Sequence, residues 1–597
     1  MRVVLLGLVA CSEYDIGAPL ELDPGTALTT PAAICEAGSA PAIEVPLEDS
    51  CEVEIQTGTF NPSTEWAVQG HNGYGPPVVG QLDDDNGDGR IDAHDTPDIA
   101  YISNTGEGVV FVNGKTGAIQ GIVNIGSDGV EGLAIGDLEG DGIPEVVAAA
   151  SATRIVVLDN RGVVKWEANV DSGGLFDFLY PAIADMDGDG LSEVIAGRTI
   201  LAFDGTLLGS GTKGVGAVPN QSGYYVEGAV SVPVDLDGDG LLEVVTGNAA
   251  YNIDGSIKYS NNLPDGCPAV ADFDGDGEPE IFAVSGNTVF ALESDLTPTG
   301  WYATFPNTNY IGPPAADDLD GDGLPEVVVV GSGEMRAYDW SGEMKWSVPV
   351  QDLSGAAGPI LFDFERDGYP EVVYADEEFV RVYNGLDGSV KLVSGDHSSA
   401  TGFETPVVAD VDADGEVEIV LLHGGGSSGL TVFGDEAHSW PSGRQVWNQH
   451  AYSITNVNDD LTLPAQEPNW ERYNNFRSGD AGLPPNAWNE LKVEIVSVCR
   501  EECPGSLRIV ARVWNEGTFA VAAGVPLVVR GASGEVLVTQ VIDVEIPSGW
   551  SSEGVELVVP TSPLLGKLPV VAIDDGAGLW TSAECDATDN AEEANGC

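Results

Sequence analysis

The sequence predicts an all-β protein: an eight-bladed β-propeller, with seven blades as the alternative, followed by an immunoglobulin-like β-sandwich. Three observations predict this fold class. The 597 residues include 77 glycines, and glycine-rich turns between short apolar runs are typical of all-β folds. An acidic loop followed by an apolar strand recurs along the middle of the chain, at the length of one four-stranded blade. After about residue 488 this repeat stops, and short alternating strands follow.

The composition limits the classes of partner. Hydrophobic residues make up 43% of the chain, which is enough for sizeable cores. The 96 acidic and 23 basic residues give a formal net charge of −73. Such a surface repels nucleic acid and anionic membranes, so we expect no nucleic-acid partner. It suits divalent cations or cationic partners, and it also keeps a protein soluble.

The N-terminus has the pattern of an export signal. Arg2 precedes a short apolar run, and Leu8-Val9-Ala10-Cys11 resembles a bacterial lipobox. The resemblance implies a lipid anchor at Cys11 on an exported outer-membrane or cell-surface lipoprotein; a plain signal on a secreted, extracellular protein is the alternative. We expect residues 1–11 to be the signal and residues 12–63 an acidic, proline-rich linker. No run reaches the roughly 18 apolar residues of a transmembrane helix.

The repeat defines a domain at residues 64–487, made of eight units. Seven regular copies of the acidic loop begin at Asp137, Asp185, Asp235, Asp272, Asp318, Asp363 and Asp410, and a variant copy lies near Gln81. Each is followed by an apolar strand such as Glu145–Ala149 and a hairpin such as Ile155–Trp166. We expect Thr64–Val68 to pair with the last blade, because closing the ring removes exposed sheet edges.

Each regular loop has the pattern Asp-x-Asp-x-Asp-Gly-x-x-Glu, which predicts a calcium site in each blade. Ca²⁺ prefers six to eight oxygen ligands. Positions 1, 3 and 5 place acids on one tight turn, glycine at position 6 permits that turn, and the acid at position 9 closes the site and starts the next strand. The predicted ligands are Asp137, Glu139, Asp141 and Glu145 (unit two); Asp185, Asp187, Asp189 and Glu193 (three); Asp235, Asp237, Asp239 and Glu243 (four); Asp272, Asp274, Asp276 and Glu280 (five); Asp318, Asp320, Asp322 and Glu326 (six); Asp363, Glu365, Asp367 and Glu371 (seven); Asp410, Asp412, Asp414 and Glu418 (eight).

Two details separate the loops. Units two and seven carry the longer Glu at position 3, so we expect weaker sites there. The first loop matches an EF-hand pattern through Asp84, Asn86, Asp88, Asp92 and Asp95, with Asp95 where glutamate is usual. A register beginning at Gln81 and Asp83 is the alternative. The calcium is expected to stabilise the turns rather than to contact a ligand.

These units resemble FG-GAP or VCBS repeats, the blade repeats of integrin α-chain propellers and bacterial surface proteins. The acidic loops carry the resemblance over residues 65–435, whereas the Gly-Ala-Pro signature is only loosely present, as in Ile311-Gly312-Pro313-Pro314. The resemblance implies a calcium-binding propeller, commonly in adhesion or carbohydrate-related proteins, and does not identify a ligand.

The segment after unit eight combines aromatic and amide side chains, as in Arg444–Tyr452, Asn456–Asp460 and Asn469-Trp470. Such residues suit sugar binding. The alternative, which we favour, is that they cap the last blade and lead to the sandwich at 488–597. That C-terminal part resembles the CARDB-type adhesion domain in Cys503-Pro504-Gly505, Val513–Gly517 and Glu584–Asn590.

Eight cysteines are present, and an exported protein permits disulfides. Proximity suggests the pairs Cys35–Cys51, Cys499–Cys503 and Cys585–Cys597, with Cys267 left over. Connectivity cannot be read from sequence, so other pairings stay open.

The sequence shows no catalytic motif. The paired carboxylates are accounted for by calcium, and the six histidines match no known catalytic pattern. We therefore expect a non-enzymatic, calcium-binding surface protein whose partner is an extracellular glycan or a surface protein. A polysaccharide-degrading enzyme, similar to calcium-rich lyase propellers, and a structural surface-layer component are the alternatives.

Overall fold

The computed structural model describes residues 41–43, 45, 60, 62–479 and 490–594, apart from 128, 172, 175–177, 220–224, 307, 309–310, 396, 400–402, 427, 466–467, 501–502, 518–520, 522–523, 532, 543, 545, 548, 565 and 574–589. The chain divides into two compact units, Glu54–Asn486 and Met1–Val53 with Ala487–Cys597. The predicted signal and lipid-anchor residue lie outside the described residues, as do Cys35, Cys51, Cys585 and Cys597. None of the described helices has the length and apolar character needed to cross a membrane.

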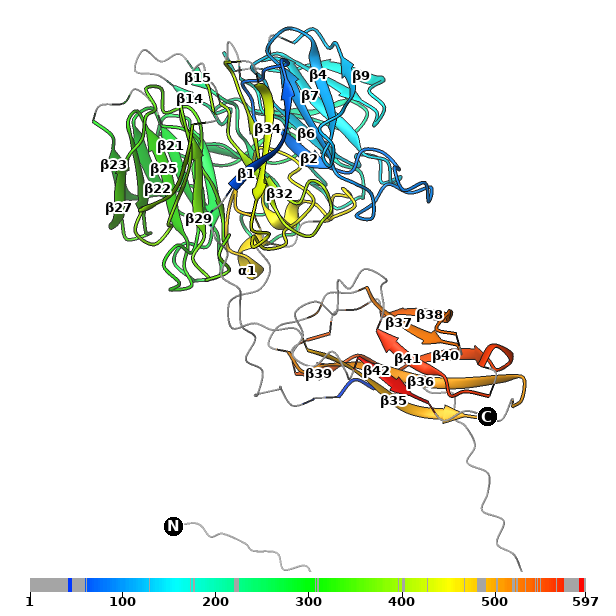
Figure 1. The fold of residues 1–597 in the computed structure, drawn as a ribbon. Coiled ribbons are helices and arrows are strands. Elements are labelled where there is room, and N and C mark those ends of the chain that lie inside the picture. The colour runs from blue at the N-terminus through cyan, green and yellow to red at the C-terminus, as the bar shows by residue number, and fades with distance from the viewer. Residues whose placement is uncertain are drawn as a thin grey trace, which may run out of the picture. The chain divides into compact units, whose positions relative to one another are not determined.

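The strands of the described residues 62–435 form eight four-stranded antiparallel sheets, one per sequence unit (Figure 1). Their strands are, in unit one, β2 (Val78–Gly80), β3 (Asp98–Ser103), β4 (Gly108–Asn113) and β5 (Ile119–Val123); in two, β6 (Leu133–Gly136), β7 (Glu145–Ser151), β8 (Arg154–Leu158) and β9 (Val164–Asn169); in three, β10 (Ala182–Ala184), β11 (Glu193–Ala196), β12 (Thr199–Leu201) and β13 (Leu207–Ser210); in four, β16 (Val232–Val234), β17 (Glu243–Val245), β18 (Ala249–Tyr251) and β19 (Ile257–Ser260); in five, β20 (Cys267–Ala271), β21 (Glu280–Ser285), β22 (Thr288–Leu292) and β23 (Pro298–Thr304); in six, β24 (Ala315–Asp317), β25 (Glu326–Gly331), β26 (Glu334–Tyr338) and β27 (Met344–Pro349); in seven, β28 (Ile360–Phe362), β29 (Glu371–Ala375), β30 (Val380–Tyr383) and β31 (Val390–Ser394); in eight, β32 (Val407–Ala409), β33 (Glu418–Leu422), β34 (Ser428–Asp435) and β1 (Pro62–Gln69). A two-stranded sheet, β14 (Val218–Pro219) with β15 (Tyr225–Glu227), is added between units three and four.

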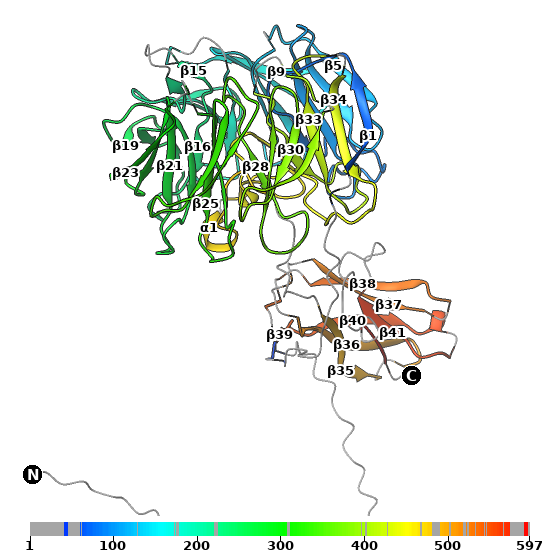
Figure 2. The ribbon, with the colours of Figure 1, turned by 60° about the vertical axis from the view of Figure 1, so that its left-hand side comes forward.

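The sheets are arranged as a β-propeller. Strands follow one another in chain order within the sheets of units one to seven, and the first strands of successive sheets contact each other around the centre. As the sequence predicted, β1 pairs antiparallel with β34, so the eighth sheet has the order β1-β34-β33-β32 and joins the two ends of the repeat region (Figures 1 and 2).

Tryptophans on outer strands hold neighbouring sheets together. Trp166 of β9 donates its indole N–H to the carbonyl of Phe203 in unit three (2.7 Å) and covers the turn at Gly205. A Cβ at Gly205 would lie 2.8 Å from that indole ring. Trp346 of β27 repeats the arrangement with unit seven, donating to the carbonyl of Gly385 (2.6 Å). The absence of a side chain at Gly205 therefore allows the sheet of unit two to lie close against that of unit three.

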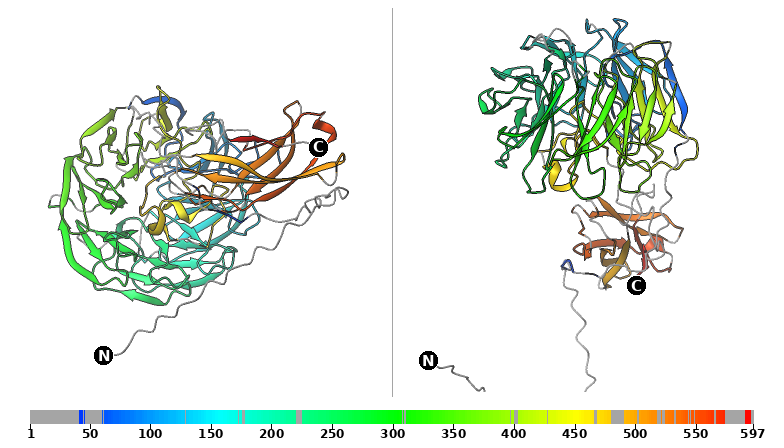
Figure 3. Two further views of the ribbon diagram at one scale, coloured as in Figure 1. Left: turned by 90° about the horizontal axis from the view of Figure 1, so that it is seen from below. Right: turned by 90° about the vertical axis from the view of Figure 1, so that its left-hand side faces the viewer.

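The centre of the ring is filled by the segment that follows unit eight. This segment includes η1 (Ile454–Asn456) and α1 (Asn469–Arg472) and lies inside the ring of sheets (Figure 3, left). Its backbone pairs with first strands far away in sequence, through Val79–Trp447, Ile135–Asn448, Ala316–Phe476 and Leu361–Arg477. We call the described residues of this segment, 444–465 and 468–479, the plug.

The burial of the plug contradicts the interpretation of its aromatic and amide residues as a sugar-binding surface. Trp447 and Tyr452 stack with ring centroids 4.3 Å apart, and both are about 98% buried or more. Asn448, Gln449 and His450 are buried with them. These side chains fill the propeller and do not present a sugar-binding surface. The segment also reaches further than the cap on the last blade that was expected, because it contacts the first strands of units one, two, six and seven.

The second unit contains two four-stranded sheets that share one buried core. In one, β35 (Leu491–Cys499), β36 (Ser506–Asn515) and β39 (Trp550–Ser551) lie in that order and β40 (Val555–Pro560) pairs with β36; the other has the order β38 (Val536–Ile542), β37 (Val525–Arg530), β41 (Val570–Ile573) and β42 (Ala591–Glu593). The short helix η2 (Ser562–Leu564) precedes β41. Ile43 and Val45, from the segment predicted as a linker, hydrogen bond with Ser551 and Gly549 of this unit. Cys267, for which the sequence suggested no disulfide partner, is buried, and its thiol donates to the carbonyl of Gly216 (3.4 Å). Cys499 and Cys503 are disulfide-bonded.

Candidate metal centres in the acidic loops

The seven regular loops share one hydrogen-bonded geometry. In unit three, the Asp185 carboxylate accepts the backbone N–H groups of Gly188, Asp189 and Gly190 at 2.8, 3.1 and 3.0 Å. Gly190 has φ +84°, a conformation that a side chain resists. The first Asp of every other regular loop accepts the equivalent glycine N–H, as seen at Asp137, Asp235, Asp272, Asp318, Asp363 and Asp410. Position 1 therefore folds the loop.

The glutamate at position 9 accepts a backbone N–H of its own loop in each regular unit, and it begins the next strand, as predicted. Glu193 is the first residue of β11 and accepts the N–H of Met186 through Oε2 (2.9 Å), which leaves Oε1 for a cation. The same Oε2 contact recurs at Glu145, Glu243, Glu280, Glu326, Glu371 and Glu418. Each of these glutamates also begins the second strand of its sheet.

The loops bring carboxylates together to different extents. In unit five, Asp272, Asp274, Asp276 and Glu280 each offer an oxygen, and these atoms lie within 4.8 Å of one another. Three-residue groups with the same spacing occur in units three, four and six; they are Asp185, Asp187 and Glu193, then Asp235, Asp237 and Asp239, then Asp318, Asp320 and Glu326. Convergent carboxylate oxygens are the donor set that Ca²⁺ prefers, so the residues of unit five fit that ion.

Burial and mutual repulsion disfavour the ionised form of several position 9 glutamates. Desolvation, followed by the charges of Asp274 and Asp272, raises the pKa of Glu280 to about 8. Desolvation and the neighbouring aspartates raise the pKa of Glu193 to about 7. In unit eight, desolvation together with Glu65 and Asp410 raises the pKa of Glu418 to about 10. A divalent cation would favour the ionised form in all three loops.

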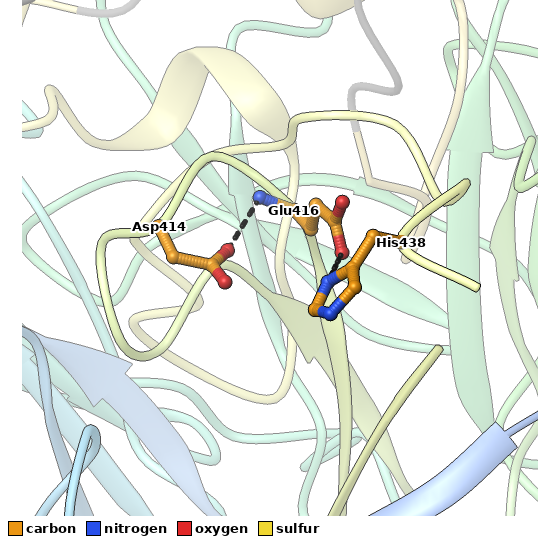
Figure 4. A group of neighbouring side chains, drawn as sticks. All are labelled: Asp414, Glu416 and His438. Atoms are coloured by element: carbon orange, nitrogen blue, oxygen red, sulfur yellow. Dashed lines mark hydrogen bonds and ion pairs between the residues drawn. The ribbon is translucent and has the colours of Figure 1, made fainter. Parts of the chain in front are cut away.

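Unit eight carries a further group that the sequence reading missed (Figure 4). Asp414 accepts the N–H of Glu416 (2.9 Å), and the Glu416 carboxylate contacts His438 Nδ1 at 3.1 Å. These three side chains have ligand atoms within 4.8 Å of one another. The His438 side chain is 76% exposed, so the group lies at the surface. His438 follows β34 and is distant in sequence from the loop, so the repeat pattern gave no signal for it.

A β-bulge on the outermost strand aims one side chain at the loop of its own sheet. In unit four the bulge falls at Lys258, between the Tyr251–Ile257 and Ala250–Tyr259 pairs. The Lys258 ammonium lies 2.7, 3.1 and 2.8 Å from carboxylate oxygens of Asp237, Asp239 and Glu243. Burial opposes the charge of Lys258, yet these hydrogen bonds raise its pKa. Bulges commonly redirect side chains in this way.

Lysines stand at the same bulge position in three other units. Lys165 contacts Glu139 (2.5 Å) and Glu145 (2.8 Å) in unit two. Lys345 contacts Asp320, and Glu326 at 3.6 Å, in unit six. Lys391 contacts Glu365, and Glu371 at 2.5 Å, in unit seven. In all four units the position 3 acid contacts the lysine, and in units two and seven this acid is the longer glutamate.

We call the side chain at this bulge position the bulge residue. The remaining sheets have no lysine there. The bulge residue is Gln120 in unit one, Leu208 in unit three and Glu65 in unit eight, and in unit five the wider bulge lies between the Phe290–Tyr302 and Leu292–Pro298 pairs. Among the described residues, no ion pair with lysine or arginine involves the acids of the unit-three or unit-five loop.

The first loop combines both registers considered from the sequence. Asp84 accepts N–H groups from Gly87 (2.7 Å) and Gly89 (2.9 Å), and the buried Asp95 accepts those of Asn86 and Asp92, as in an EF-hand loop. The framework contact of the other units is made by Asp98, which begins β3 and accepts the N–H of Leu82 (3.1 Å). Desolvation and the charge of Asp83 raise the pKa of Asp98 to about 7. The sequence pattern did not identify Asp98, because the longer first loop places it further along the chain than position 9 of the other loops.

Comparison with known proteins agrees with the repeat and the fold. The FG-GAP-like repeat family matches residues 137–196, 318–374 and 363–421. The comparison with curated proteins finds no match. Among solved structures, the V. cholerae biofilm matrix protein Bap1 is similar at 20% identity and a TM-score of 0.62, covering 71% of this chain and 100% of Bap1.

Two more distant structures have lower scores. Rhamnogalacturonan lyase YesW is 17% identical with a TM-score of 0.43, covering 72% of this chain and 80% of that one. A quinohemoprotein alcohol dehydrogenase from Comamonas testosteroni is 12% identical with a TM-score of 0.38, covering 70% and 83%. At these identities a likeness concerns the fold alone, and of these three structures Bap1 has a TM-score high enough to support it.

Proposed function

We propose that this chain is an exported, non-enzymatic adhesion protein: a calcium-stabilised, eight-bladed FG-GAP propeller joined to an immunoglobulin-like, CARDB-type sandwich. Each of the eight sheets is one blade. The unit-five loop carries the proposal, because four carboxylates converge there and no basic side chain of the described chain pairs with them. Calcium would be held by the loop acids, and it would act by stabilising the folded ring.

Three features support the proposed location of the protein and its proposed role. The −73 net charge suits a calcium-rich exterior. The Leu8–Cys11 signal supports export and a lipid anchor at Cys11, with secretion as the alternative. The fold is shared with a protein described as a biofilm matrix component, which favours a role in attachment between surfaces. The partner would be an extracellular glycan or a surface protein.

The buried plug supports binding on the outer faces of the ring rather than in its centre. Trp447, Asn448 and Gln449 occupy the place where a central ligand site would lie. A partner would therefore meet the loop-bearing rims or the second unit.

The experiment has two arms on the full chain. Thermal unfolding with millimolar calcium and with excess EGTA tests the calcium role, and a clear rise of the melting temperature with calcium is expected. Labelled protein is then applied to immobilised glycans and to whole cells, with turnover of the same glycans followed in parallel. Saturable binding without turnover supports the proposal; degradation of a polysaccharide, or an unchanged melting temperature, argues against it.

A further inference from the structure

The eight loops do not all require a metal ion. We propose that the bulge residue on the outermost strand decides the cation of each loop: units two, four, six and seven are neutralised by their own lysine, and calcium binds in units one, three, five and eight. This inference rests on the proposed calcium-binding function and assigns it to particular loops.

The lysine occupies the place of an ion. Lys258 Nζ lies 2.7–3.1 Å from oxygens of Asp237, Asp239 and Glu243, which are three of the four predicted ligands of its loop. A calcium ion held by the same oxygens would meet the positively charged ammonium at close range. Calcium would have to displace the side chain before it could gather six or more oxygens.

The lysine contacts are partly buried, so water does not screen them as it screens surface pairs. The side chains of Lys258 and Glu243 are 16% and 1% exposed, and those of Lys391 and Glu371 are 15% and 0% exposed. Removing either partner would leave a poorly solvated charge. These ion pairs therefore persist in the absence of metal and compete with it.

In the loops of units one, three and eight, the bulge residue is not a cation, and a different side chain faces the loop acids in each. In unit three, Asp187, Asp189 and Glu193 line a pocket of about 340 Å³, and Leu208 lines its apolar side. In unit eight, the bulge residue is Glu65, which adds a carboxylate to the loop. Lys115 approaches that loop from unit one, but its ammonium contacts the backbone carbonyl of Asp412 (3.3 Å). Gln120 is neutral in unit one and donates to Asp83 (3.2 Å).

Counting the bound ions tests this assignment. Full-length protein stripped with EGTA and dialysed is titrated with calcium by isothermal calorimetry, and bound calcium is measured after equilibrium dialysis. Four ions per chain are expected, one for each loop without lysine. Leu208→Lys should reduce the count to three and raise the melting temperature in EGTA, because the new ammonium reaches the unit-three loop.

Two further variants complete the test. Leu207→Lys is the matched control: it adds the same charge at the adjacent residue, which is 60% exposed, and should leave the count at four. Lys258→Met should open the unit-four loop, lowering the melting temperature in EGTA and raising the count to five. If Lys258→Met does not fold, Leu208→Lys still decides the question.

The outcomes separate the two proposals. Eight ions in the wild type, or a count that Leu208→Lys leaves unchanged, overturns the assignment by bulge residue while calcium binding itself stands. No bound calcium in any variant overturns the proposed calcium function. Counts of four, three, four and five for the wild type, Leu208→Lys, Leu207→Lys and Lys258→Met support both.

Discussion

Glu65 on β1 stands at the register position that Lys165 holds on β9. Thr64 pairs with Phe433 and Trp66 with Val432, just as Val164 pairs with Leu158 and Trp166 with Val157, so the extra bulged residue is Glu65 in one sheet and Lys165 in the other. The sheet that joins the two ends of the ring therefore places an acid where four other sheets place a lysine. If calcium neutralises this loop, as proposed above, the contact between the two ends of the repeat region would depend on a cation from solution.

Reversing this charge should make ring closure less dependent on calcium. In Glu65→Lys, the new ammonium would approach Asp412 and Asp414, whose charges now raise the pKa of Glu65 to about 7 after desolvation, the larger cause. We expect a higher melting temperature in EGTA, by a stabilisation of about 1 kcal/mol because the site is half exposed, and a smaller further rise with calcium. Thermal unfolding with and without calcium measures both. Thr64→Lys, which places the charge one residue away, should change neither; equal effects of the two variants would contradict the register argument.

Sheet-to-sheet packing should fail when the turn glycine gains a side chain. Gly205 has φ +83° and its Cβ would lie 2.8 Å from Trp166, whereas Gly333 has φ +78° with open space around it. Gly205→Ala combines backbone strain with overpacking and should destabilise the propeller by about 2–4 kcal/mol. Gly333→Ala should cost about 1 kcal/mol, for the backbone alone. Urea unfolding at fixed calcium compares them, and equal losses would show that the tryptophan contact is unimportant.

The plug should contribute to stability rather than to recognition. Trp447→Ala removes a buried, stacked indole and should cost about 3–5 kcal/mol of unfolding free energy. Trp550→Ala, at a position 44% exposed in the other unit, is the control for loss of a tryptophan and should have little effect on propeller unfolding. Unchanged stability of Trp447→Ala together with lost glycan binding would restore the sugar-site reading.

The buried Asp265 should make stability fall as the pH rises. Desolvation outweighs the N–H groups of Val215 and Ala217 and raises the pKa of Asp265 to about 6, above the value of about 4 expected for the unfolded chain. The folded state then holds the extra proton between these values, so the stabilisation is full below about pH 4 and is lost as the pH rises through 6.

Asp265→Asn isolates this effect. The unfolding free energy of the variant relative to wild type should increase from pH 4 to pH 6.5, measured by urea denaturation at constant calcium. The exposed Asp295→Asn serves as the control and should track the wild type. A difference between Asp265→Asn and wild type that stays constant with pH would refute the assigned titration.

The parts of the fold that were predictable are those that repeat. The spacing from Asp137 to Asp410 located the seven regular loops and their sheets, and the position 9 glutamates begin strands as expected. The plug could not be found in this way, because Trp447 and His450 belong to a single copy whose burial depends on strands over 300 residues away. The partnership of Lys258 with Asp237 was hidden by the bulge, which breaks the strand alternation that sequence patterns reveal. Ile43 pairs with Ser551 at a separation of 508 residues, which no local pattern encodes.

The pairing of β1 with β34 has a consequence for how the chain is made. The sheet that contains Pro62 cannot form until Asp435 has been synthesised. The plug, which fills the centre, is synthesised after that. Seven sheets can form locally and early, whereas the last depends on contacts of very long sequence separation, which are slow to form. During synthesis β1 would remain an unpaired strand until β34 is made, and this strand carries the charged and aromatic Glu65-Trp66 in its middle rather than a purely aliphatic run.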